Sequence, residues 1–370
     1  MFEDKKINVS LITQINPSEL LKKLNWYEDR GYKSVLILVA NAEYEKFRDL
    51  MPAFNKLNLT IAGGFFPSLC YEDKLYDEGA LLIGIGATTR ISPIDTDPVK
   101  TVPINTQTNE FSAIVFLNAL STDADEHINV INNILDPNLP VIGMGVGALD
   151  FIHRPAIFTN DGLVTNSSLL VILDTKVIQT TTHGYEAIAG PFLVTQTEGN
   201  VTYELNYQPA FEVYSNSLVE FCDEKLSQDN FFDLTKVYPL GIENSDGSFI
   251  IKNPITTDGN GFTSVGSIPQ NSVVYIMKGE ESKMLKTSKD AALEICEISE
   301  AENEQTANIV FSIGCISRKL FLDKNYEQEL RVVSTIPAAV HAGVLSMGEV
   351  SNYNASNATF LNNTLVLGLF

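Results

Sequence analysis

Residues that usually hold metals or carry out redox chemistry are scarce in this chain. Its 370 residues include only four histidines and four cysteines. No HExxH or HxH motif is present, which excludes the common zinc-enzyme arrangements, and neither a GxSxG elbow nor a phosphate-binding P-loop occurs. The cysteines form no CxxC pair, so we expect reduced structural thiols rather than disulfides or a metal cluster.

Positive charge is scarce as well: 25 lysines and arginines stand against 46 aspartates and glutamates, for a net charge of −21. Nucleic-acid binding requires a basic surface, and anionic membranes also repel an acidic protein. No apolar run approaches the roughly 20 residues that cross a bilayer, and the opening MFEDKKINVSLITQ does not resemble a secretory leader. We therefore expect a cytoplasmic protein that contacts neither nucleic acid nor membrane.

One succession of elements, namely strand, helix, strand, polar gap and strand, occurs three times. The copies cover residues 33–86, 111–174 and about 308–370. Each copy opens and closes with an apolar run typical of a strand buried on both faces. The repeats predict an α/β (α+β) fold of layered sheets covered by helices, with the last strand inside a sheet and a ligand cavity at the strand tips. The opening runs are SVLILVA, SAIVFLN and NIVFSIG, and the closing runs are GALLIGIG, SSLLVILD and NNTLVLGLF.

The pattern changes between the second and third copies, where we place a boundary between two domains, residues 1–205 and 206–370. Residues 282–289 are polar and are expected to form a surface loop, whereas residues 318–334 fit one helix. The other elements expected here are helices 209–222 and 288–299 and strands near 236–242, 248–253 and 272–278.

A glycine-rich stretch, GMGVG at residues 143–147, follows a predicted strand. It reads GxGxG rather than the GxGxxG of dinucleotide-binding proteins, and no helix follows that could present its N-terminus to a pyrophosphate. We interpret these glycines as close backbone packing or as the floor of a ligand pocket. The pocket interpretation assigns ligand contacts to Gly143, Gly145 and Gly147, and to Gly64 and Phe65 at the end of the matching strand in the first copy.

His183 is the histidine best placed for function. It follows an apolar strand and precedes Gly184, and ligand-contacting residues of α/β folds gather at such strand ends. The alternative is a histidine that only forms hydrogen bonds within its own loop. His127, by contrast, is expected on the exposed side of a helix.

Two opposite charges stand near strand ends in the third copy. Arg318 is expected where a new helix begins, a position at which a cation needs an anionic partner. Glu349 lies between apolar neighbours in the predicted strand 346–350. The two side chains fit either a buried ion pair with each other or contacts to a ligand.

The C-terminal residues resemble the closing signature of FIST domains, with Gly-Glu-Val at 348–350 and a final Asn-Thr-Leu-Val-Leu. Further stretches resemble the same family in the same order, so that the resemblance runs from about residue 32 to 370. These stretches are GPFLVT at 190–195, QPAF at 208–211, YPLGI at 238–242 and IVFSIGCISR at 309–318.

This resemblance implies a FIST N-terminal-like domain over 1–205 and a FIST C-terminal-like domain over 206–370. FIST domains are intracellular ligand-binding modules tied to bacterial two-component kinases and chemoreceptors, which implies a non-catalytic sensor that regulates a separate partner such as a histidine kinase. The NosP branch is similar in layout, binds haem and senses nitric oxide. If this chain binds haem, the candidate axial ligands are His183 and Tyr238.

Two other functions stay open at the level of the sequence. One is an enzyme that uses His183 and Glu349 as acid and base at the strand ends. The other is a scaffold without a ligand, whose acidic surface docks a basic partner.

Overall fold

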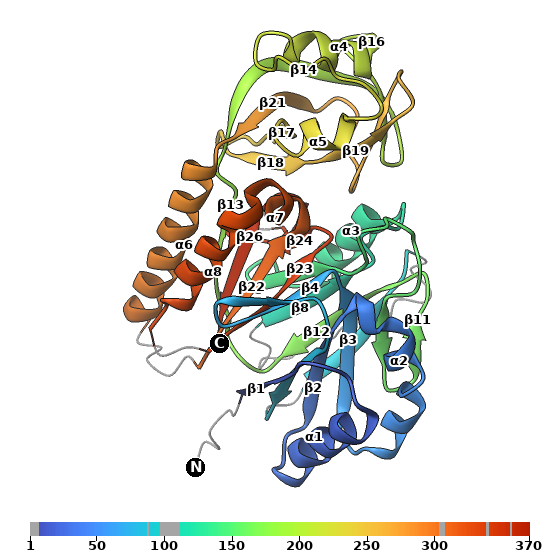
Figure 1. Ribbon diagram of the computed structural model, residues 1–370, viewed down its shortest axis with the longest axis vertical. Helices are drawn as coiled ribbons and strands as arrows, with labels where there is room; N and C mark the ends of the chain where they lie inside the picture. Colours follow the sequence, from blue (N-terminus) through green and yellow to red (C-terminus); the bar gives the residue numbers. More distant parts are fainter. Residues whose placement is uncertain (1–6, 87–88, 97–111, 303–307, 338–339, 356) are drawn as a thin grey trace.

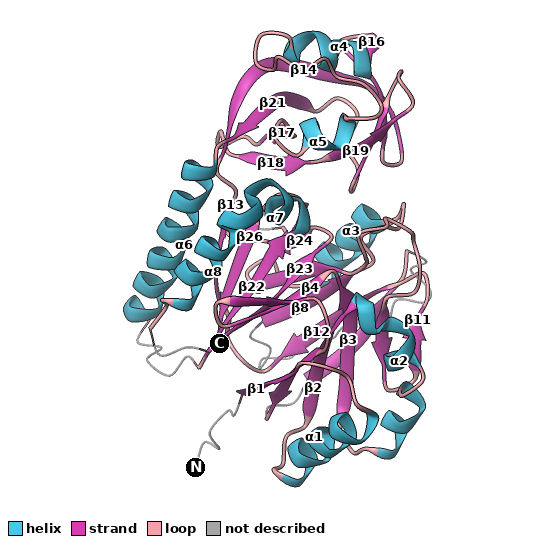
Figure 2. Ribbon diagram, in the orientation of Figure 1, coloured by secondary structure: helices cyan, strands magenta, loops and turns pink. Residues whose placement is uncertain are grey.

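The computed structural model describes residues 7–86, 89–96, 112–302, 308–337, 340–355 and 357–370. In this part of the chain, three six-stranded sheets pack together, and a fourth sheet stands at one end of the molecule (Figure 1). Helices lie on the outer faces of the packed sheets (Figure 2). This α+β architecture confirms the predicted fold class. None of the helices in the described ranges combines the length and apolar character of a membrane span.

We extend each copy to include the elements that precede its central strand. Four strands of each extended copy, namely the preceding, central, parallel and closing strands, lie in one packed sheet, and its remaining hairpin lies in another. The first copy comprises β1 (Ile7–Ile12), α1 (Pro17–Asp29), β2 (Ser34–Ala40), η1 (Asn41–Glu43), α2 (Tyr44–Arg48), η2 (Met51–Lys56), β3 (Thr60–Phe66), β4 (Ser68–Tyr71), β5 (Lys74–Tyr76) and β6 (Ala80–Ile85). The second comprises β7 (Thr89–Ile94), β8 (Ser112–Leu117), α3 (Ala124–Ile134), β9 (Val141–Gly145), β10 (Ile157–Thr159), β11 (Gly162–Val164) and β12 (Ser168–Leu173). The third comprises β13 (Ile178–Thr182), α6 (Glu281–Ala301), β22 (Ile309–Cys315), α7 (Ile316–Leu322), η3 (Asp323–Asn325), α8 (Tyr326–Ser334), β23 (Val340–Ser346), β24 (Glu349–Ser351), β25 (Thr359–Leu361) and β26 (Leu365–Leu369).

Strand register shows that the three copies are equivalent. In each copy the central strand, β2, β8 or β22, pairs in parallel with the strand after the helix and antiparallel with the closing strand. The residue at the middle of each central strand pairs with a glycine of the parallel neighbouring strand and with a leucine of the antiparallel neighbouring strand. The three sets are Gly63–Ile37–Leu82, Gly143–Val115–Leu170 and Gly343–Ser312–Leu367.

A cyclic exchange of hairpins joins the copies. The hairpin β4–β5 of the first copy pairs with β23 of the third, β10–β11 of the second pairs with β3 of the first, and β24–β25 of the third pairs with β9 of the second. Every packed sheet is therefore completed by strands from another copy. The closing strand β26 lies between β13 and β22 and is fully buried, as predicted for the last strand.

All three copies contribute to a small cavity between the sheets. Its volume is about 20 Å³, enough for about one water molecule. Its lining is apolar apart from Thr175, and such cavities usually stay dry. This cavity is too small for a ligand, and the ligand pocket that the repeats predict stays a prediction. Equivalent lining residues are Leu36, Ile114 and Phe311 on the central strands and Ile85, Leu173 and Phe370 at the closing strands.

The fourth sheet belongs to a segment inserted into the third copy, between β13 and α6. This inserted domain, residues 185–279, has a core of its own that includes Tyr214 and Phe262. In the first copy the same place is taken by the short connection between β1 and α1. The elements of the inserted domain are β14 (Tyr185–Glu198), β15 (Val201–Leu205), β16 (Gln208–Pro209), α4 (Ala210–Leu218), α5 (Phe231–Thr235), β17 (Leu240–Glu243), β18 (Phe249–Lys252), β19 (Pro254–Thr257), β20 (Phe262–Ser264) and β21 (Val273–Gly279).

Two predictions about helices were wrong. Residues 282–289 do not form a surface loop but the first half of α6, because Met284 and Ser288 are buried one helical turn apart on the face that packs inward. The single helix predicted over 318–334 is divided into α7 and α8, and the break falls at Asp323, whose φ is +45°.

Candidate functional site

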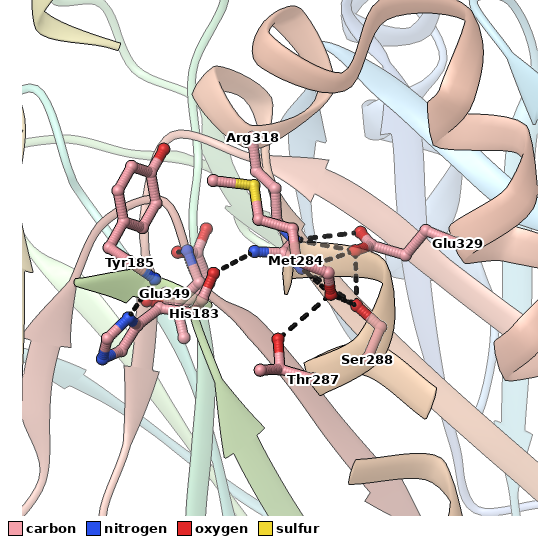
Figure 3. A network of polar contacts seen from close by, with 9 residues as sticks. His183, Tyr185, Met284, Thr287, Ser288, Arg318, Glu329 and Glu349 are labelled. Carbon is pink, nitrogen blue, oxygen red and sulfur yellow. Dashed lines mark hydrogen bonds and ion pairs between the residues drawn. The ribbon is translucent and has the colours of Figure 1, made fainter. Parts of the chain in front are cut away.

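Arg318 is the hub of a buried polar network where the inserted domain joins the third copy (Figure 3). Its side chain has no exposed surface. The Nε donates to the Glu329 carboxylate at 2.8 Å. The Nη1 donates to the His183 carbonyl at 2.5 Å, while Nη2 donates to the Met284 carbonyl at 3.1 Å and to Ser288 Oγ at 2.9 Å.

These contacts fix both chain segments that connect the third copy to the inserted domain. His183 stands between β13 and β14, at the entry to the domain, and Met284 lies in the first turn of α6, directly after the exit. One guanidinium therefore holds the two linkers together. A single bidentate carboxylate balances its charge inside the protein.

The structure corrects the predicted ion pair. Arg318 pairs with Glu329 at 2.7 Å, not with Glu349, and no dashed line joins Arg318 to Glu349 in Figure 3. Both predicted positions are otherwise as expected, because Arg318 lies in the first turn of α7 and Glu349 lies in a strand. That strand, β24, is separate from β23, and Gly348 with φ +112° makes the turn between them.

Glu349 is fully buried without a cationic partner among the described residues. Its Oε1 accepts a hydrogen bond from Ser346 Oγ at 2.6 Å and its Oε2 accepts one from the Thr364 amide at 3.2 Å. Burial raises the pKa of Glu349 to about 8, although hydrogen bonds from Ser346, Thr364 and the Cys315 thiol oppose the rise. At neutral pH this carboxyl group is mostly protonated.

Unpartnered polar atoms lie beside Glu349. Asn363 precedes Thr364 and is completely buried, with φ +54°, yet neither atom of its carboxamide has a hydrogen-bond partner in the described structure. The backbone amide of Asn363 donates to the Cys315 sulfur, which also contacts Glu349. Buried polar groups are almost always paired, so an unpaired carboxamide indicates a missing partner.

The inserted domain supplies further atoms of this kind. Asn253 donates from its backbone amide to Asn362 Oδ1 at 2.9 Å and from Nδ2 to Ser317 Oγ at 3.1 Å, but its Oδ1 has no partner among the described residues. We call the group of Asn253, Cys315, Glu349, Asn362 and Asn363 the junction site, because it lies where the inserted domain meets the third copy.

The predicted glycines serve backbone packing. The Gly145 amide donates to the Gly348 carbonyl at 2.7 Å, and the Gly147 amide donates to the Phe65 carbonyl at 2.9 Å. A Cβ on Gly143 would lie 2.7 Å from the Val115 side chain, and one on Gly64 would lie 2.6 Å from that of Val146. These contacts match the packing alternative, and a ligand contact at these glycines stays a prediction.

His183 and Tyr238 lie in different surroundings. The Nδ1 of His183 accepts a hydrogen bond from the Tyr185 amide at 3.0 Å, and burial together with the charge of Arg318 lowers the pKa of His183 to about 4. A Cβ on the adjacent Gly184 would lie 2.8 Å from the α6 backbone at Met284. Tyr238 donates its hydroxyl to the Phe221 carbonyl at 2.9 Å in the core of the inserted domain.

Haem binding through either side chain stays a prediction. A bound haem needs an axial ligand that faces a large apolar pocket. Two open surface hollows, of 510 and 280 Å³, are lined by residues other than His183 and Tyr238. Ligation of a haem through Tyr238 would break its hydrogen bond to the Phe221 carbonyl, and His183 could ligate only through Nε2, because its Nδ1 is bound to the Tyr185 amide.

His127 was also placed wrongly by the sequence pattern. It faces the interior from α3, only 1% exposed, and its Nδ1 contacts Ser168 Oγ at 2.9 Å. The histidine is compatible with this position because burial lowers its pKa and keeps the imidazole neutral. Groups of three or more residues suited to a metal ion do not occur among the described residues.

Comparison with known protein families matches two models to consecutive parts of the chain, the FIST N domain over residues 34–208 and the FIST C domain over residues 210–352. The chain belongs to the FIST family. FIST domains are associated with sensors in signal transduction. Residues Arg318 and Glu349, which carry part of the resemblance, both lie within the FIST C match.

Among curated proteins, the FIST chain is similar to the uncharacterized protein MJ1623 of Methanocaldococcus jannaschii. The two are 27% identical over 156 residues, which is 40% of this chain and 29% of the relative. The matched part thus spans less than a third of that protein.

The two FIST models meet near residue 209, close to the predicted division at 205/206. In space, however, the strands on either side of this point share one sheet, since β14 pairs with β21 and β15 pairs with β20. The inserted domain therefore includes the end of the FIST N match and part of the FIST C match.

Proposed function

We propose that this FIST protein is a non-catalytic sensor, which binds a small polar molecule in the junction site and regulates a separate signalling partner such as a histidine kinase. The observation that supports this proposal most strongly is the carboxamide of Asn363, fully buried with both of its polar atoms unpaired. Leaving such groups unpaired costs about 1–3 kcal/mol each, which a ligand with matching groups would recover.

Access to the junction site requires movement. Asn253, Glu349 and Asn363 are all at most 1% exposed, so a ligand can enter only if the inserted domain separates from the third copy. The linkers at residues 182–185 and 279–281 are short and contain Gly184 and Gly279, as expected of a hinge. Occupancy of the site would thus be coupled to the position of the inserted domain, which a partner protein can read.

Asn363 should decide ligand binding. We expect Asn363→Gly to weaken binding at least tenfold, because the ligand loses a buried donor and acceptor, while glycine adopts the φ of +54° without strain. The matched control is Asn166→Gly, at the equivalent, exposed position of the second copy with φ +56°. Thermal-shift screening of polar metabolites followed by calorimetry on the three proteins measures the effect. Equal losses in both variants would contradict this role.

The haem-based version of the sensor rests on the resemblance alone. Because Tyr238 donates to the Phe221 carbonyl and the His183 Nδ1 accepts from the Tyr185 amide, we expect protein purified from haem-supplied cells to show no Soret band. The absorbance spectrum is the measurement. A Soret band that shifts with nitric oxide and disappears in His183→Ala would show instead that the protein rearranges to bind haem.

A further inference from the structure

We infer that the junction site takes a small organic cation, such as an ammonium group, which pairs with Glu349. This inference rests on the proposed function and specifies the chemical class of its ligand. The site holds a fully buried carboxyl group, and a group in such a place ionises readily only when a cation pairs with it.

The cationic side chains near the site already form ion pairs with other residues. Arg318 is bound to Glu329 at 2.7 Å. Lys252, next to Asn253 in the chain, is 3% exposed and lies 3.4 Å from the Asp125 carboxylate. Within the described residues, Glu349 therefore has no positive partner from the protein itself.

The unpartnered atoms around Glu349 are mainly acceptors. Both Asn253 and Asn363 have a free Oδ1. An ammonium group offers three hydrogen-bond donors and a positive charge, which suit carboxamide oxygens and a carboxylate. An anionic ligand would find only the Asn363 Nδ2 as a free donor among these side chains, and it would face a carboxyl group.

The other titratable groups that face Glu349 are Cys315 on β22, Arg318 on α7 and Tyr326 on α8. Burial raises the pKa of the Cys315 thiol and of Tyr326, so both stay neutral. Arg318 is positive at all relevant pH values. Glu349 is thus the one group in this set that changes charge near neutral pH, and a bound cation favours its ionised form.

Binding should therefore release a proton. With a pKa of about 8 the free carboxyl group is mainly protonated at pH 7, so a cation that requires the carboxylate displaces a proton there. Below the pKa, affinity should rise about tenfold per pH unit, and it should level off above pH 8.

The experiment uses the full chain and calorimetry in two buffers of different ionisation enthalpy, at pH 6, 7 and 9. The probes are methylamine, ethanolamine and 1,4-diaminobutane, each matched with its neutral counterpart: methanol, ethylene glycol and 1,4-butanediol. The variants are Glu349→Gln and Asn363→Gly. The glutamine keeps the shape, can accept from the Thr364 amide through Oε1 and can donate from Nε2 to Ser346 Oγ. Melting temperatures establish that both variants are folded.

We expect at least one amine to bind at least tenfold more tightly than its alcohol, with a large proton release at pH 6 and 7 and a small one at pH 9. Glu349→Gln should abolish both the preference and the proton release. If the alcohols bind as well as the amines and no proton is released, the cation inference is overturned, but Asn363-dependent binding would keep the sensor proposal. If no probe binds in any condition, the cation inference fails, and a metabolite screen without a single Asn363-dependent ligand would remove the sensor proposal as well.

Discussion

Replacing Glu329 by alanine is expected to lower the free energy of unfolding by about 3–5 kcal/mol, because it leaves the fully buried Arg318 guanidinium without a counter-charge. The loss should be larger than for an ordinary buried polar residue, since Arg318 also holds the His183 and Met284 carbonyls of the two linkers. Urea denaturation of the wild type and the variant measures the difference.

Two controls separate the buried charge from general damage. The double variant Arg318→Met/Glu329→Leu should recover much of the stability, because apolar side chains of similar size can replace a buried ion pair at little cost. Glu327→Ala removes the exposed partner of Arg331 on the same helix and should change stability by less than about 0.5 kcal/mol. The account of Arg318 would be contradicted if Glu329→Ala and Glu327→Ala were equally mild.

Gly343→Ala should destabilise the scaffold by about 1–3 kcal/mol or more. A Cβ at this position would lie 2.1 Å from the Ser312 carbonyl oxygen on the neighbouring central strand, and backbone cannot move aside as a flexible side chain can. Gly63→Ala, the equivalent change in the first copy, should act in the same way, since its Cβ would lie 2.1 Å from the Ile37 carbonyl.

The control for this prediction is Gly241→Ala in the inserted domain. Its Cβ would meet the flexible Met277 side chain at 2.6 Å, which can move, so the change should be milder. Thermal unfolding of the three variants gives the comparison. Equal stability of all three would show that the repeated glycines do not fix the spacing of the strands in each copy.

The three copies could be found in the sequence because their central and closing strands are buried on both faces and read as continuous apolar runs. The hairpin exchange could not, since short strands such as β10 pair with residues of another copy that are distant in the chain. Only some elements of the inserted domain could be predicted from the sequence. Its longest strand, β14, alternates between exposed and half-buried residues and contains a proline, which weakens the pattern of a strand.

At the site, the sequence indicated Arg318 and Glu349 but not the residues that form hydrogen bonds and ion pairs with them. Glu329 could have been suspected, because it lies on the same face of α8 as Tyr326 and Val333, and a charge on an apolar face needs a partner. Ser288 was hidden in a polar stretch that reads as a loop. The unpaired carboxamide of Asn363 depends on tertiary packing, and no local pattern predicts it.

Amide hydrogen exchange tests most directly whether the junction site opens through movement of the inserted domain. The amides of Asn253 and Asn362 bond across the junction, to Asn362 Oδ1 and the Ile251 carbonyl. The Ser267 amide bonds from the inserted domain to Asp125 on α3 of the second copy. We predict that they exchange together, faster than the amides of the central strands β2 and β8, and that a saturating ligand slows them by a common factor of about 100 at 100 times its Kd. If these three amides exchange as slowly as the amides of β2 and β8, with or without ligand, the inserted domain does not move to open the junction site.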